Sequence, residues 1–225
     1  MKKVIRILFV LLVAALAVIS AVVTLSGYFD KNVTQKYEYE RGPNINDSFD
    51  GLVLVSPDTK NSADMVSFAL HAWENGWGYV WGTFGDVLNE YSLMELAVRY
   101  PSVMEDRMKF ITKNWLGRRC ADCSGLIKAY LWYEPGIGVN YGAYSYPDED
   151  ANTMFANAKV SGDIETIPEI PGLAVWCDGH IGIYIGEGTV VEAMATDYGV
   201  VKTKLEGYTG SRWTHWFELE HIEYP

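Results

Sequence analysis

The chain has 225 residues, of which 49% are hydrophobic and 14% aromatic, and its formal net charge is −11. This length and composition suit one folded domain with a well-buried core, and they exclude a disordered or fibrous protein. The acidic balance argues against nucleic acid as a partner, because binding to phosphate requires a basic surface. Three cysteines are too few for a disulfide-based scaffold.

Residues 1–26 carry the clearest signal of organisation. Three basic residues among the first six precede an uncharged run over residues 7–25, nearly as long as the roughly 20 residues that cross a bilayer. The basic flank favours a cytoplasmic N-terminus. We therefore expect a single transmembrane helix in the lipid bilayer, with the rest of the chain outside the cell membrane. Cleavage of a signal peptide near Ala15-Leu16-Ala17 is the alternative and would give a secreted protein.

Residues 27–60 are polar and rich in turn-forming residues, so we predict an extracytoplasmic linker, with a short strand possible at 52–55. A helix is predicted to begin with Ser62 as its N-cap and to end at Gly76. The segment Tyr79-Val80-Trp81-Gly82 follows it directly.

Residues 83–118 are predicted to form a helical insertion, with two helices separated at Tyr100-Pro101. A stripe of apolar residues on the second helix indicates its buried side and consists of Met104, Met108, Ile111 and Trp115. A further helix is predicted to follow Asp122, its N-cap, and to end at about Tyr133.

Residues 134–170 are rich in Gly, Pro, Asp and Asn and are predicted to be loops. After Pro171-Gly172 the hydrophobic period changes to two, which is typical of strands. The predicted strands are 173–177, 181–185, 189–194, 200–205 and 213–219. Helices followed by an antiparallel run of strands predict an α+β domain over residues 61–225.

Cys120 and Cys123 lie three positions apart, a spacing used by three kinds of chemistry. With Cys177 and His180 they form an acceptable zinc ligand set, but such pairs usually lie on short turns rather than at a helix start. A redox Cys-x-x-Cys has its first cysteine at the helix start, whereas here the second cysteine lies there. A nucleophile at Cys123 fits better, because the helix start lowers a thiol pKa and its N–H groups stabilise an oxyanion. We therefore expect neither a metal nor a cofactor.

A cysteine nucleophile needs a base, and His180 is the best placed of the four histidines. In the alternating strand "HIGIYIG" it shares a face with Gly182, where the glycine would leave room for a substrate. A three-residue turn at 186–188 would pair Gly182 with Glu192 and place that carboxylate beside His180. A two-residue turn would place it among the isoleucines instead. We expect Glu192 to orient His180; a structural histidine and an exposed glutamate are the alternatives.

Two motifs together resemble the NlpC-type family of bacterial papain-like cysteine peptidases: Asp122-Cys123-Ser124-Gly125-Leu126 and, later, Gly179-His180-Ile181-Gly182. Tyr79-Val80-Trp81-Gly82 and Val191-Glu192-Ala193 are also similar to segments of that family, and the resemblance spans about residues 62–220. It implies a reduced papain-like α+β domain, with N-terminal helices packed on an antiparallel sheet, and peptidoglycan stem peptide as substrate.

The resemblance implies two groups of site residues. The catalytic group consists of Cys123 as nucleophile, His180 as base and Glu192 as the group that orients the base. The group beside the oxyanion and the substrate consists of Tyr79, Asp122 and Ser124. Glu192 departs from the family pattern, which often has histidine there. The insertion at 83–118 is longer than in compact members, so its helices are expected to overhang the cleft and narrow specificity.

The sequence therefore predicts a monomeric, extracytoplasmic cysteine endopeptidase that hydrolyses a peptide bond in the stem peptide of bacterial peptidoglycan. Amidase or transpeptidase chemistry on the same substrate is one alternative, and a catalytically silent cell-wall-binding module is another. Cys120 and Cys177 lie at matching offsets before Cys123 and His180, so a disulfide between them is a further expectation.

Overall fold

A computed structural model describes residues 39–44, 48–206 and 212–225. The predicted anchor at 7–25 lies outside these residues. Within them, no helix combines the length and apolar character needed to cross a membrane. The described residues belong to one compact unit, which includes 39–44 and 48–60 from the predicted linker at 27–60.

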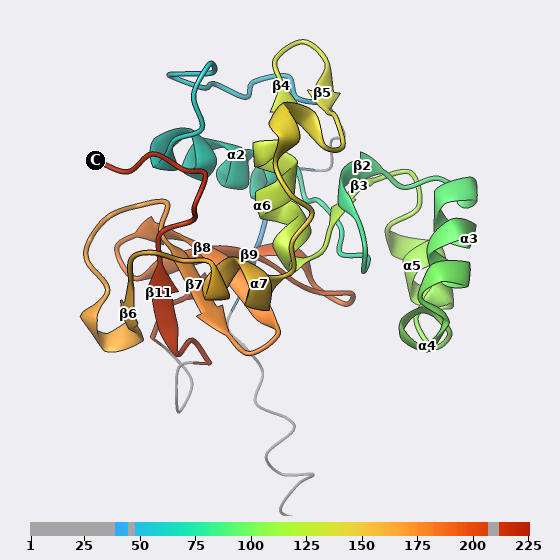
Figure 1. Ribbon diagram of the computed structural model, residues 1–225. Coiled ribbons are helices and arrows are strands. Elements are labelled where there is room, and N and C mark those ends of the chain that lie inside the picture. The colour runs from blue at the N-terminus through green and yellow to red at the C-terminus, as the bar shows by residue number, and fades with distance from the viewer. Residues whose placement is uncertain (1–38, 45–47, 207–211) are drawn as a thin grey trace, which may run out of the picture. The chain divides into compact units, whose positions relative to one another are not determined.

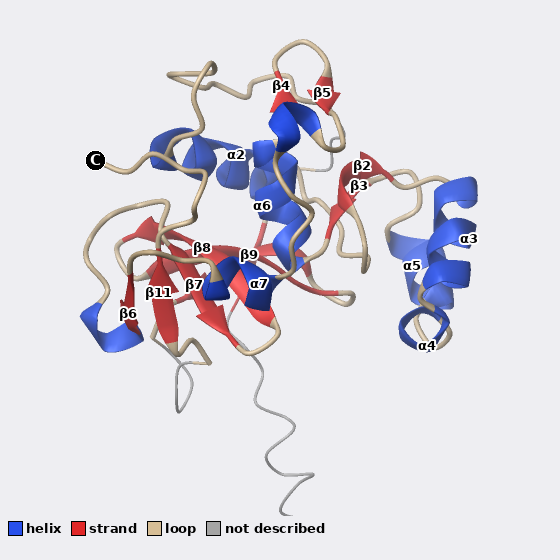
Figure 2. Ribbon diagram, in the orientation of Figure 1, coloured by secondary structure: helices blue, strands red, loops and turns tan. Residues whose placement is uncertain are grey.

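The largest sheet of this unit is antiparallel and has seven strands. Figures 1 and 2 show it below the helices α2 (Ser62–Glu74) and α6 (Cys123–Leu131). In spatial order its strands are β1 (Tyr39–Arg41), β10 (Gly199–Lys204), β9 (Thr189–Ala195), β8 (His180–Gly186), β7 (Ala174–Cys177), β11 (His215–Phe217) and β6 (Ser161–Asp163). All five predicted strands are formed, and β1 and β6 are added at the two edges. The mixed architecture with an antiparallel sheet agrees with the prediction.

The strand expected at 52–55 is not formed. The backbone N–H groups of Val55 and Ser56 bond to the buried Asp64 carboxylate instead, at 2.6 and 2.8 Å. Because a strand would need those donors for its own ladder, this side chain holds the segment as a loop.

Two helices pack on one face of the sheet. These are α2 (Ser62–Glu74) and α6 (Cys123–Leu131), which contact each other and the strands β8 and β9. The N-cap of α2 is Asn61, one residue before the predicted Ser62, and its side chain accepts the Asp64 N–H. Apolar residues of both helices and the inward side chains of β8 and β9 form the main core.

The insertion contains three short helices rather than two, grouped together in Figure 1. They are α3 (Glu90–Arg99), α4 (Pro101–Met104) and α5 (Met108–Asn114), and the strands β2 (Phe84–Val87) and β3 (Arg119–Ala121) flank them. The break at Pro101 is as predicted, because proline cannot continue α3. Met104, Ile111 and Trp115 are buried as expected, and Met108 is half-buried.

Residues 134–170, expected to be loops, contain several elements of two to six residues. They are the end of β4 (Tyr133–Glu134), β5 (Gly138–Val139), a 3₁₀ turn at Ala143–Ser145, α7 (Ala151–Ala156), β6, and a 3₁₀ turn at Ile164–Thr166. Elements this short do not show a hydrophobic period, which explains why the sequence pattern missed them.

The strands β8 and β9 are joined by the two-residue turn 187–188, so the predicted three-residue turn is wrong. That turn alone would place Glu192 on the isoleucine face. A bulge at Ile185 shifts the pairing by one residue, so that Ile183 pairs with Val191. Glu192 therefore lies on the face that was predicted, but only because of the bulge.

Candidate active site

Cys123 is the first residue of α6 and follows its N-cap directly. The residue is only 6% exposed and borders a cavity of about 700 Å³. Arg99 and Tyr100 from the insertion and the segment 148–153 also line this cavity. The insertion thus contributes to the cleft wall, and the cavity is large enough for a small peptide.

The surroundings of Cys123 keep its thiol protonated. Burial, followed by the charge of Asp122, raises the pKa of the Cys123 thiol to about 12. The backbone N–H groups of Ser124 and Ile181 lower this pKa, but by less. The expectation that the helix start gives a low thiol pKa is therefore wrong for this protein, because desolvation outweighs the backbone hydrogen bonds that lower the pKa. The thiol needs a base to become a nucleophile.

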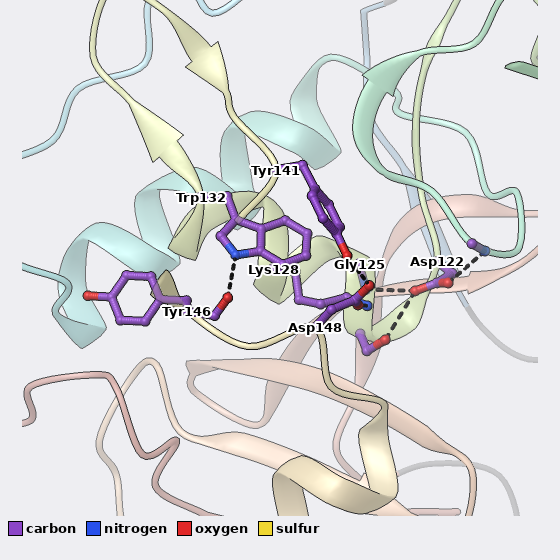
Figure 3. A network of polar contacts seen from close by, with 9 residues as sticks. Asp122, Gly125, Lys128, Trp132, Tyr141, Tyr146 and Asp148 are labelled. Atoms are coloured by element: carbon purple, nitrogen blue, oxygen red, sulfur yellow. Dashed lines mark hydrogen bonds and ion pairs between the residues drawn. The ribbon is translucent and has the colours of Figure 1, made fainter. Parts of the chain in front are cut away.

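Asp122 connects the start of α6 to the segment that ends at Gly82 (Figure 3). Its Oδ1 accepts the N–H of Gly125 at 2.7 Å and the Ser124 hydroxyl at 3.2 Å, while Oδ2 accepts the N–H of Gly82 at 2.8 Å. Gly125 is required here, because a Cβ at that position would lie 2.0 Å from the Thr83 carbonyl oxygen. The helix start therefore lies directly against the preceding turn.

Tyr79 completes this group of residues. Burial raises the pKa of its hydroxyl far above the ordinary value, and electrostatic interactions with Cys123 and Asp122 raise it further. The Tyr79 hydroxyl is therefore neutral and lies near both residues. The structure thus brings together four of the predicted site residues: Tyr79, Asp122, Cys123 and Ser124.

A second group lies on the sheet. His180 begins β8, and its Nε2 lies 2.7 Å from Oε2 of Glu192 on β9. Glu192 has no exposed surface; its Oε1 accepts the Thr203 hydroxyl at 2.6 Å, and its Oε2 also accepts Nη2 of Arg212. Burial on its own would raise the pKa of Glu192, but the hydrogen bond from His180 and the charge of Arg212 reverse this and lower it. The carboxylate is therefore ionised.

The ionised carboxylate fixes the tautomer of His180. Because a carboxylate offers only acceptors, Nε2 of His180 must carry the hydrogen that Glu192 accepts. Nδ1 is then the nitrogen that can take up a proton.

Among the described residues, Cys123 makes no hydrogen bond with the His180 ring. The connection runs through Ile181, which follows His180 on β8 and whose backbone N–H acts on the Cys123 thiol. Hydrogen bonds between catalytic groups are often long before substrate binds.

Three residues of the second group were missed by the sequence analysis: Thr203, Arg212 and Trp213. Trp213 stacks on the His180 ring with a centroid distance of 5.4 Å and an interplanar angle of 19°. A Cβ at Gly182 would lie 3.1 Å from Trp213, so the space predicted for substrate there is occupied by this indole. The period-two pattern of β10 could have revealed Thr203; no pattern singles out Arg212.

Cys120 and Cys177 are not part of a disulfide or a metal site among the described residues. All three thiols are free, so the expected disulfide between Cys120 and Cys177 is not formed. Cys120 is fully buried, and its thiol lies 3.9 Å from the Trp115 carbonyl oxygen. The zinc ligand set is not assembled either, since the described part of the chain contains no cluster of three or more potential metal ligands.

A network of polar contacts beyond Cys123 holds the loop after β5 on α6 (Figure 3). Lys128 Nζ lies 2.5 Å from Oδ1 of Asp148, whose other oxygen accepts the Tyr141 hydroxyl at 3.0 Å. One turn further along α6, Trp132 donates to the Tyr146 carbonyl at 3.1 Å. Lys128, Tyr141 and Asp148 line the cavity, so this network shapes one of its walls.

Neither a protein-family model nor a curated protein matches the chain. Seven chains of solved structures match it. One is the peptidoglycan hydrolase RipB from Mycobacterium tuberculosis, with 18% sequence identity and a TM-score of 0.38. The match covers 73% of this chain and 68% of the RipB chain. A similarity of this size transfers no residue roles.

Proposed function

We propose that the chain is a cysteine endopeptidase that hydrolyses a peptide bond in the stem peptide of bacterial peptidoglycan, outside the cell membrane. One arrangement of residues carries the proposal. Cys123, at the start of α6, borders a large cavity and lies beside the strand β8. That strand begins with His180, which is paired to the buried Glu192. The Asp-Cys-Ser-Gly and Gly-His-x-Gly motifs support the substrate class by their resemblance to the NlpC-type family.

In the proposed reaction, Nδ1 of His180 takes the proton of the Cys123 thiol as the thiolate attacks the scissile carbonyl carbon. The carbonyl oxygen becomes an oxyanion, which backbone N–H groups at the start of α6 stabilise with Tyr79 nearby. The imidazolium then protonates the leaving amine, and water hydrolyses the acyl-enzyme to release the second product. Glu192 stabilises the imidazolium. Because burial and the charge of Asp122 raise the pKa of the Cys123 thiol, the thiolate forms only with His180 as the base.

The decisive experiment is digestion of purified muropeptides by the full-length protein, with product masses determined by mass spectrometry. Cys123→Ala is expected to abolish turnover, because it removes the one thiol among the residues that line the cavity. Cys120→Ala is the matched control, since it removes a buried thiol three residues earlier and should retain activity. Cleavage that persists in Cys123→Ala would reject the mechanism. Cleavage of the amide bond between the sugar and the stem peptide would instead indicate an amidase. Transfer of the acyl group to an acceptor amine would indicate a transpeptidase.

A second candidate function is a cell-wall-binding module without turnover. The observation that favours it is the protonated, buried Cys123 thiol, which has no hydrogen bond to His180 in the described part of the chain. In that case the wild type and Cys123→Ala would bind muropeptides equally well, and neither would cleave them. Glu192→Gln distinguishes the candidates further, because it should slow an enzyme but leave simple binding unchanged.

A further inference from the structure

The buried carboxylate of Glu192 poses an electrostatic problem that His180 alone does not solve. An ionised carboxylate without solvent exposure is costly unless an opposite charge compensates it. A base ready to accept a proton must be neutral, so His180 cannot supply that charge in the resting state. A permanent cation is needed, and an arginine guanidinium such as that of Arg212 supplies one.

Arg212 contacts Glu192 directly. It is linked to His180 through the ring of Trp213, which lies between them. Its Nη2 donates to Oε2 of Glu192, the same oxygen that accepts Nε2 of His180. The Arg212 guanidinium also lies over the Trp213 ring, 4.7 Å from its centroid. Trp213 stacks in turn on His180. The four side chains therefore form one packed assembly, in which Thr203 holds the remaining Glu192 oxygen.

Two other titratable groups among the described residues lie near this assembly, Cys177 and Asp178. Cys177 on β7 lies opposite His180 in the sheet, and its thiol pKa is raised, chiefly by burial, with Arg212, Glu192 and Asp178 as further influences. Asp178 lies in the turn before His180 and accepts a hydrogen bond from Asn152. Neither residue supplies a positive charge, so among the described residues Arg212 is the permanent cation that contacts Glu192.

We infer that Arg212 is a positioning residue for the proposed reaction: it keeps Glu192 ionised and oriented while His180 is neutral, so that Nδ1 of His180 stays available as the base. Catalysis thus depends on four side chains, Cys123, His180, Glu192 and Arg212. This inference rests on the proposed function for its catalytic meaning, but the charge state of Glu192 can be measured without turnover.

The test is an NMR titration of the Glu192 carboxyl carbon in the full-length protein, assigned with Glu192→Gln. Removing the neighbouring cation in Arg212→Gln should raise the pKa of Glu192 by about one unit or more. Arg212→Lys keeps the charge and should restore most of the wild-type value, and it serves if the glutamine variant is poorly folded. Arg107→Gln is the matched control, because that arginine pairs with Asp197 at an exposed site.

Kinetics provide the second measurement. The acidic limb of the kcat/KM profile should move to higher pH in Arg212→Gln and return in Arg212→Lys, whereas a merely structural role would lower the rate without moving the limb. An unchanged Glu192 titration in folded Arg212→Gln would overturn the inference. If the titration shifts but the wild type cleaves no muropeptide, the electrostatic role stands and the proposed function fails.

Discussion

The carboxylate of Asp122 accepts a hydrogen bond from the backbone N–H of Gly82 at 2.8 Å, across 40 positions of sequence. The same carboxylate caps α6 through Gly125 and is the second cause, after burial, of the raised Cys123 pKa. One side chain therefore assembles the site and, at the same time, makes its thiol less acidic.

Asp122→Asn is expected to lower the pKa of Cys123 from about 12, because it removes the negative charge and keeps a side chain that caps helices well. The measurement is the rate of iodoacetamide alkylation at Cys123 against pH, with peptide mapping. Asp148→Asn is the control, since it neutralises another carboxylate of the same cavity. Equal alkylation profiles for Asp122→Asn and the wild type would contradict the prediction.

Gly125→Ala should destabilise the fold by about 1–3 kcal/mol, the usual cost of overpacking. The physical reason is the contact of 2.0 Å that its Cβ would make with the Thr83 carbonyl oxygen, which is backbone and cannot rotate away. Urea unfolding followed by tryptophan fluorescence measures the change. Ser102→Ala, at an exposed position of α4, should stay within about 0.5 kcal/mol of the wild type. A similarly small effect at Gly125 would show that the turn moves away.

Lys60 contacts the C-terminal end of α6, and we expect it to make the stability of the fold depend on pH. Its Nζ donates to the carbonyl oxygens of Tyr130 and Tyr133 at 3.0 and 2.9 Å, and burial lowers its pKa from 10.5 to about 8. Because the folded protein releases this proton before the unfolded chain does, Lys60 adds stability as the pH rises from about 8 to 10.5.

Lys60→Met should remove that increment. The unfolding free energy of the wild type should therefore increase relative to that of the variant over this pH range. Comparing the two proteins cancels the titration of the tyrosines. Lys204→Met, at an exposed position, should give a difference that does not change with pH. A pH-independent difference for Lys60→Met would contradict the assignment.

Arg99 gives a prediction about specificity. It lines the cavity from the end of α3 and has no hydrogen bond or ion pair with any described residue. Arg99→Gln is therefore expected to lower kcat/KM about tenfold for a peptide with a free carboxylate, and to leave its carboxamide twin unchanged. Arg107→Gln, also within the insertion, is the control. Equal losses on both peptides would assign Arg99 a structural role.

The elements that carry Cys123 and His180 could be predicted because their signals are local. Asp122 caps a helix with an apolar face, and the isoleucines of β8 alternate over a whole strand. The charge environment of Cys123 could not be predicted in the same way, since burial is a property of the packed molecule. Arg212 was out of reach for the same reason: it follows β10 in the chain and reaches Glu192 only through the tertiary fold.

The bulge at Ile185 has a consequence for how this hairpin can change. If residue 185 were instead paired within the ladder, the two-residue turn would continue its register along β8 and bring Ala193, instead of Glu192, opposite Gly182. The bulge therefore determines which residue of β9, Glu192 or Ala193, lies on the same face of the sheet as His180. Substitutions that keep the bulge are compatible with the site, whereas a change that draws residue 185 into the ladder would exchange its acid for an apolar side chain.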